Sequence, residues 1–245
     1  MIHFVVVAGT PAAVRTVSPR LSNSLYQTRL FDGDVVERRG TSRTWAVAAI
    51  ALPDPTCEAR LVTVGDAMVV INGPALAIGG EQRRLAEDLL RKFTAAGSAA
   101  VARALSGSYN FIGVAPSHGL RGFVDFSGLF PIYWHEGLDL AVFSNRSTTI
   151  AKLIGSKGWD LRSLAWVIGH ANLFGDRMPA SGASYLLPGS EAQVDWGDGR
   201  VRLDVSPHWP WPPLSEDGQR DNLSPAEWDA VTDTLIGQFW RLAEP

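Results

Sequence analysis

Four short segments between Tyr109 and Ser144 constrain the fold more than any other feature of this sequence. Apolar and polar residues alternate within them, which is typical of β-strands. Ser117-His118-Gly119 and Glu136-Gly137 supply residue types that tight turns prefer. We therefore predict four strands joined by tight turns into a β-meander. They span residues 109–115, 120–126, 130–135 and 138–144.

The residues on either side of this meander indicate helices and further strands. Leu85, Leu89, Leu90 and Phe93 share one face of a predicted helix that stops at Gly97. The predicted helices span residues 81–96, 98–105, 148–154 and 161–169. The other predicted strands span residues 2–8, 44–52, 60–64, 67–71, 184–187, 193–196 and 200–205. This order of elements favours an α+β layered sandwich.

The character of the sequence changes near its C-terminus. Residues 207–221 are rich in Pro, Trp and charged residues and show no periodicity, which is typical of a linker. Ser224-Pro225 is typical of a helix start, and apolar residues keep helical spacing after it. We therefore predict a domain over residues 1–206, a linker over 207–223 and a helix over 224–245 that requires a partner surface.

Composition argues against several kinds of partner. The net charge is -3, so a nucleic-acid partner is not favoured. Cys57 is the single cysteine, which excludes an internal disulfide or a structural zinc site. No run approaches the ~20 apolar residues of a membrane span, and a cytoplasmic location is expected. His118, His135, His170 and His208 lack metal-ligand spacing, so we interpret them as turn or surface residues and predict no metal site.

Several short motifs follow one another along the chain. They are Asn72-Gly73, the segment from Leu105 to Phe111, Asp125-x-x-Gly128-x-x-Pro131-Ile132-Tyr133-Trp134, Phe143-Ser144-Asn145 and Pro188-Gly189-Ser190. This order resembles the N-terminal glutaminase domain of asparagine synthetase-like proteins, a group that includes β-lactam synthetases and lasso-peptide cyclases. The resemblance covers about residues 60–245. It implies an Ntn-hydrolase-like fold, a four-layer αββα sandwich of two stacked, mainly antiparallel sheets, followed by the C-terminal helix.

The resemblance also implies roles for individual residues. Asn72 and Gly73 match the pair that lines the family's glutamine pocket, here a vestigial one, and Arg43 is a candidate for its carboxylate-binding arginine. The second group, Asp125, Gly128, Pro131, Tyr133 and Trp134, is a structural motif. Gly128 permits a turn conformation that other residues avoid, and Pro131 restricts φ at the start of a strand. Tyr133 and Trp134 are expected to point to opposite faces of that strand.

The family's catalytic residues have no counterpart. Its glutaminases use a cysteine at the second encoded position, with its own α-amino group as the base. Ile2 occupies that position, Cys57 lacks the α-amine, and His3 has no nucleophile to activate. We therefore predict no catalytic residue in this chain, and we keep an active glutaminase with an unconventional nucleophile only as a minor alternative.

The family's synthetase half contains an S-G-G-x-D-S loop that binds ATP, and this loop does not occur here. The resemblance thus implies a non-catalytic glutaminase-like domain that scaffolds a synthetase domain in cis or in trans, with homodimers also expected. ATP and Mg are expected only in that synthetase domain, with no cofactor in this chain. The alternative is a self-contained interaction module that docks through residues 207–213 and the C-terminal helix.

Overall fold

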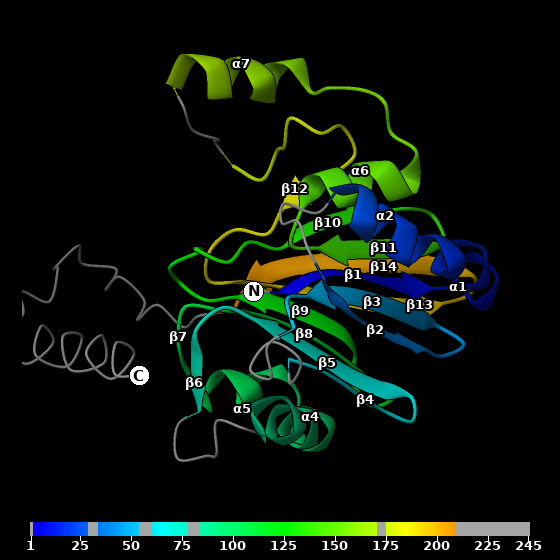
Figure 1. Cartoon of the computed structure of the whole chain (residues 1–245), viewed down its shortest axis with the longest axis vertical. Coiled ribbons are helices and arrows are strands. Elements are labelled where there is room, and N and C mark those ends of the chain that lie inside the picture. The colour runs from blue at the N-terminus through cyan, green and yellow to red at the C-terminus, as the bar shows by residue number, and fades with distance from the viewer. Residues whose placement is uncertain (1, 29–33, 54–59, 78–83, 171–174, 209–245) are drawn as a thin grey trace, which may run out of the picture. The chain divides into compact units, whose positions relative to one another are not determined.

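The computed structural model (Figure 1) describes residues 2–28, 34–53, 60–77, 84–170 and 175–208. These residues belong to one compact unit, Met1–His208. The predicted helix over 224–245 and the predicted linker, apart from Pro207 and His208, lie outside the described residues.

The first sheet has six strands in the order β12-β10-β11-β1-β3-β2, and every neighbouring pair is antiparallel. Its central strand, β1, is buried along its whole length, and apart from His3 its residues are apolar or glycine, as expected for a strand with both faces covered. The strands are β12 (Ser184–Tyr185), β10 (Tyr133–Glu136), β11 (Leu140–Ser144), β1 (Ile2–Gly9), β3 (Trp45–Ala51) and β2 (Val36–Thr41).

The second sheet also has six antiparallel strands, in the order β14-β13-β9-β8-β5-β4. A separate ribbon pairs β6 (Ala75–Ala77) with β7 (Leu105–Gly107). The strands of the sheet are β14 (Arg200–Pro207), β13 (Ser190–Gly197), β9 (Gly119–Val124), β8 (Asn110–Ala115), β5 (Ala67–Asn72) and β4 (Leu61–Val64).

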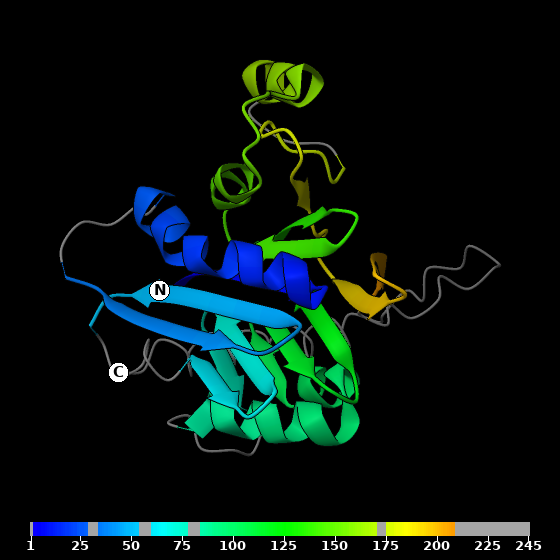
Figure 2. The same cartoon turned by 90° about the vertical axis from the view of Figure 1, so that its right-hand side faces the viewer.

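Helices cover the outer faces of both sheets (Figures 1 and 2). The first sheet packs against α1, α2 and α6, and the second packs against α4 and α5. The helical elements are α1 (Pro11–Val17), the 3-10 turn η1 (Ser18–Arg20), α2 (Leu21–Thr28), α4 (Leu85–Ala96), α5 (Ser98–Ala102), α6 (Ser147–Ile154) and α7 (Leu161–His170).

Three apolar clusters hold these layers together. Alternate residues of β1 belong to different clusters: Phe4 and Val6 lie between the sheets, whereas Val5 and Val7 lie under the helices of the first sheet. Phe93 of α4 and Phe111 of β8 belong to the third cluster, under the helices of the second sheet. The layer order is therefore helix, sheet, sheet, helix, and the predicted four-layer αββα sandwich is confirmed.

The predicted meander is wrong in its connectivity. β8 and β9 form one hairpin in the second sheet, whereas β10 and β11 form another in the first sheet. Residues 125–132 therefore cross from one sheet to the other and do not turn back within a hairpin. The strand predicted over residues 130–135 corresponds to β10, which begins at Tyr133 and not at residue 130. The side-chain amide of Asn110 binds the carbonyl oxygens of Phe130 and Pro131, in place of ladder bonds from a neighbouring strand.

Other boundaries differ for local reasons. α5 ends at Ala102, and not at residue 105, because Leu105 belongs to β7 and pairs with Ala77. The helical region Pro11–Thr28 and strand β2 were not predicted. α2 has the sequence LSNSLYQT, whose Ser and Asn residues disguise its apolar face. Within the described residues, every helix is too short or too polar to cross a membrane.

Candidate functional site

Asn72 lies at the end of β5, beside the first residue of β1. It is 3% exposed, and its Oδ1 accepts a long, 3.5 Å hydrogen bond from the backbone N–H of Ile2. It shares its face of β5 with Met68 and Val70, so its side chain extends between the two sheets. The sheets thus bring together two residues that are 70 positions apart in the sequence.

Asn145 fixes the same end of β1 from the opposite side. Its Nδ2 donates to the carbonyl oxygen of Ile2 at 2.8 Å, and its Oδ1 accepts from the N–H of Phe4 at 3.1 Å. The regular pairing between β1 and β11 begins at Val5 and Ser144, so the Asn145 side chain continues the hydrogen bonding beyond the last paired residue. The backbone of Ile2 is therefore bound through both its N–H and its carbonyl.

Gly73 follows Asn72 with φ at 104°, a conformation that favours glycine. A Cβ atom at this position would collide with the carbonyl oxygen of Ser108 and would lie 2.8 Å from the ring of Phe130. The guanidinium of Arg60 donates a hydrogen bond to the Gly73 carbonyl. Asn72 and Gly73 thus form a tight turn that is covered by the crossover between the sheets.

Neither side chain at the start of β1 offers a reactive group to this turn. Ile2 is 1% exposed and belongs to the apolar cluster between the sheets. His3 points to the opposite face, where its Nε2 lies 2.9 Å from Oγ1 of Thr149. Burial, and secondarily the positive charge of Arg146, lowers the pKa of His3 to about 4. His3 is therefore neutral near pH 7 and is separated from Asn72 by the sheet. Cys57 lies outside the described residues.

Asn110 completes the polar group at this end of the sandwich. It is the cross-strand partner of Asn72 and is fully buried. Its Nδ2 donates to two carbonyl oxygens of the crossover, but its Oδ1 has no hydrogen-bond partner among the described residues. Sequence reasoning missed Asn110. The signal was an amide side chain at the start of an otherwise apolar strand, where a buried polar group requires a partner.

Arg43, the candidate for a carboxylate-binding arginine, is not part of this group. It lies in the turn between β2 and β3, next to Trp45, and Trp45 pairs with Ala8 at the far end of β1. Ala51, at the other end of β3, pairs with Ile2. Six residues of extended chain separate the two positions, a distance of about 20 Å.

Asp125 connects several segments at the point where the chain leaves the second sheet. It is 2% exposed, and its carboxylate accepts from the N–H groups of Tyr109, at 3.2 Å, and Ser127, at 2.9 Å. Its backbone carbonyl also accepts from the N–H groups of Gly128 and Gly189. Gly128 has φ at 65°, and a Cβ there would lie 2.5 Å from Cγ of Pro188. These contacts stabilise the crossover and leave the Asp125 carboxylate occupied.

Tyr133 and Trp134 follow the crossover on β10. Tyr133 packs against the cluster beneath α2 and α6, whereas Trp134 packs against the cluster between the sheets. Their side chains therefore point to opposite faces, as predicted. The ring of Tyr133 lies 5.8 Å from that of Tyr185, and burial raises the pKa of Tyr133.

The histidines differ in part from their interpretation as turn or surface residues. His118 does lie in the turn between β8 and β9. The side chain of His208 is only 7% exposed, stacks on Phe123 at 4.3 Å and lies 3.0 Å from the Glu191 carboxylate. Among the described residues, no three His, Cys, Asp or Glu side chains come together as a metal site would require.

No protein-family model matches this chain, and neither does any curated protein. Two solved structures share part of its backbone path. One is described as glutamine phosphoribosylpyrophosphate (PRPP) amidotransferase from B. subtilis complexed with ADP and GMP, with 11% identity and a TM-score of 0.46. The other is described as the allosteric regulatory enzyme of purine biosynthesis, with 11% identity and a TM-score of 0.47. Each match covers 82% of this chain and 48% of the other, so this chain spans about half of their length. At these values neither similarity indicates what this chain binds or catalyses.

Proposed function

We propose that this chain contributes a non-catalytic, glutaminase-like domain to an ATP-dependent, amide-forming enzyme that resembles the asparagine synthetases. The domain scaffolds the synthetase domain, which holds ATP and Mg²⁺ and carries out bond formation. The order of the sequence motifs and the four-layer architecture both favour this role. One observation carries the proposal. Asn72 accepts a hydrogen bond from the backbone N–H of Ile2, and the residue at this second position, where the resemblance implies a nucleophilic cysteine, has an apolar side chain buried between the sheets.

The chemistry of glutamine hydrolysis explains why this observation supports the proposal. Attack on the glutamine amide requires a nucleophilic side chain in contact with a general base. The side chain of Ile2 has no nucleophilic atom and is enclosed in the apolar cluster. The backbone N–H of Ile2 is engaged by Asn72, and the ring of Phe130 lies against Gly73. In this proposal the Asn72-Gly73 turn now stabilises the sandwich and no longer binds a reacting amide.

This arrangement also suggests where the nitrogen of the product comes from. A domain without a nucleophile supplies no ammonia from glutamine. We therefore infer that the enzyme uses an amine of the substrate itself, as in closure of a lactam or macrolactam, or else takes up free ammonia. Both reactions require ATP to activate a carboxylate in the synthetase domain, and neither requires an active glutaminase.

A glutaminase assay on the full chain tests the loss of activity directly. Purified protein is incubated with excess glutamine, and released ammonia is measured by a coupled glutamate dehydrogenase reaction. An active glutamine amidotransferase serves as the positive control. We expect no release above the protein-free blank, and no mass adduct with the glutamine analogue 6-diazo-5-oxo-norleucine. Ammonia release that disappears in an Asn72→Ala variant would contradict the proposal.

The scaffolding role requires a second experiment. The coding sequence downstream of Pro245 is expected to continue, or to be followed by a separate gene, with an S-G-G-x-D-S motif. If the motif lies in a separate gene, the two co-expressed chains should elute together as a stable complex on size-exclusion chromatography. If the reading frame continues, the joined protein should elute as a single folded species. A synthetase segment that is equally soluble and active without this chain would exclude a scaffolding function.

A further inference from the structure

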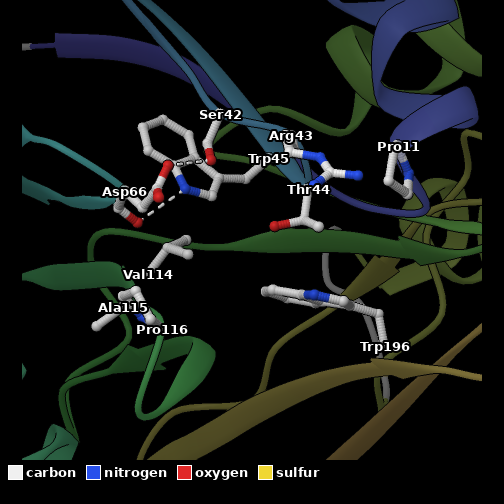
Figure 3. Close-up of a pocket in the computed structure, with 10 residues that line it drawn as sticks. All are labelled: Pro11, Ser42, Arg43, Thr44, Trp45, Asp66, Val114, Ala115, Pro116 and Trp196. Atoms are coloured by element: carbon white, nitrogen blue, oxygen red, sulfur yellow. Dashed lines mark hydrogen bonds between the residues drawn. The ribbon is translucent and has the colours of Figure 1, made fainter.

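A cavity lies beside Trp45, which pairs with Ala8 at the end of β1 opposite Ile2 and Asn72. Figure 3 shows the residues that line this cavity. Its volume is about 370 Å³, within the range of small-molecule sites. Parts of both sheets line it: the β2–β3 turn with Arg43 and Thr44, Asp66 between β4 and β5, Pro116 after β8, and Trp196 of β13. No step of the proposed function involves this cavity, so it requires a separate explanation.

Hydrogen bonds hold one wall of the cavity in place. The hydroxyl of Ser42 donates to the Asp66 carboxylate, and the indole N–H of Trp45 donates to the Asp66 carbonyl at 3.0 Å (Figure 3). The carbonyl of Thr44 accepts from the N–H of Gly9 at 2.9 Å. The β2–β3 turn is therefore tied both to the second sheet and to the central strand of the first. A wall built in this way is largely preorganised for a ligand.

Arg43 supplies the cavity with an available positive charge. Its side chain is exposed, and within the described part of the chain its guanidinium makes no hydrogen bond or ion pair. In Figure 3 the guanidinium extends toward Pro11, whereas Asp66 lies on the far side of Trp45. The Asp66 carboxylate is already bound by Ser42, so an anion is directed toward Arg43 and away from Asp66.

Trp196 supplies a flat apolar surface opposite Arg43. Its ring is half-buried and packs on the cluster between the sheets, which limits its freedom. Figure 3 shows Arg43 and Thr44 on one side of the cavity and the Trp196 indole on the other. An aromatic face that is rigid on one side and open on the other favours stacking with a planar group.

We propose that this cavity binds a small planar organic anion, that is, an aromatic or heteroaromatic carboxylate. The ring of the ligand stacks on the indole of Trp196, and the carboxylate pairs with the planar fork of the Arg43 guanidinium, which matches its geometry. The volume accommodates one or two fused rings. This inference is independent of the proposed function, because the site lies at the end of β1 opposite Ile2 and Asn72.

Isothermal titration calorimetry on the full chain tests the proposal with three probes. 2-Naphthoate is planar and anionic, 2-naphthamide is planar but neutral, and cyclohexanecarboxylate is anionic but not planar. We expect measurable binding of 2-naphthoate only, or binding at least about tenfold tighter than that of the other two. A cavity that only absorbs apolar rings would bind the amide as well, and a surface cation alone would bind both carboxylates equally.

Variants then locate the bound ligand. Arg43→Gln removes the charged pair and should weaken 2-naphthoate binding by at least about tenfold. Arg103→Gln is the matched control, because Arg103 is also exposed but caps α5 and does not line the cavity; it should leave binding unchanged. Trp196→Phe keeps an aromatic ring in the core but has no indole N–H. The indole signal that disappears from its nitrogen-15 correlation spectrum is therefore the signal of Trp196. That signal should shift when 2-naphthoate is titrated into the unsubstituted protein.

Three outcomes would overturn the proposal. The first is an absence of 2-naphthoate binding to a protein that is folded by circular dichroism. The second is equal affinity in the Arg43→Gln and Arg103→Gln variants. The third is binding that leaves the Trp196 indole signal unmoved, which would assign the ligand to another surface. None of these results depends on the glutaminase assay, so the two proposals can fail separately.

Discussion

Substitution of Asp125 by alanine tests whether the crossover between the sheets depends on this carboxylate. Asp125 is 2% exposed and accepts hydrogen bonds from the N–H groups of Tyr109 and Ser127. Asp125→Ala leaves the fully buried Tyr109 donor without a partner, at a cost of about 1–3 kcal/mol. The Ser127 donor is partly solvated and adds about 1 kcal/mol. We therefore expect a total destabilisation of about 2–4 kcal/mol.

Urea unfolding followed by circular dichroism measures this change in the free energy of unfolding. Asp125→Asn retains one acceptor oxygen and should lose about half as much stability as Asp125→Ala. Asp139→Ala serves as the matched control, because the exposed Asp139 side chain makes no hydrogen bond or ion pair with the described residues. It should change the stability by no more than about 0.5 kcal/mol. An Asp125→Ala protein as stable as the control would refute the assignment of Asp125 as a structural anchor.

Three further predictions concern the start of β1 and its surroundings. Gly73→Ala should lower the melting temperature by several degrees, because φ is 104° and the new Cβ collides with the Ser108 carbonyl. Asn145→Ala should destabilise the protein by about 1–3 kcal/mol and speed hydrogen exchange at the Phe4 amide, because that N–H loses its acceptor; unchanged exchange at Phe4 would contradict this prediction. The pKa of His3 is about 4 when folded and about 6.5 when unfolded, so the unfolded chain takes up the extra proton between these values. The free energy of unfolding should therefore fall by up to about 3 kcal/mol as the pH drops from 6.5 to 4. Urea unfolding midpoints measured across this pH range should depend less on pH in His3→Gln than in the unsubstituted protein.

The strands and most helices could be predicted because their periodicity is a local property. The face formed by Leu85, Leu89, Leu90 and Phe93 lies within α4, and all four residues are buried as expected. α2 escaped prediction because its contacts are with the sheet beneath it. Buried Ser22 and Ser24 contribute nothing to an apolar pattern, although Ser24 is satisfied by the Leu21 carbonyl and Ser22 by Glu37.

The candidate site was predictable only in part. The Asn72-Gly73 motif identified one residue pair of this site, and Ile2 was recognised as an apolar residue at the start of β1. The contact between them depends on the packing of two sheets, so spacing along the chain contains no trace of it. The same holds for Arg43 and Trp196, which come from different sheets and line one cavity only because the sheets stack with these ends together.

By itself, the sequence determined that this chain forms strands and helices in a layered order and that no thiol stands at the start of β1. Alternation of apolar residues has a period of two in any strand, whichever sheet the strand joins. The tertiary structure alone decided that β9 and β10 belong to different sheets, and that residues 125–132 cross between them. The physical reason is that side chains satisfy backbone groups of this crossover that a hairpin would pair within a sheet: Asp125 accepts from the N–H of Ser127, and Asn110 donates to the carbonyls of Phe130 and Pro131.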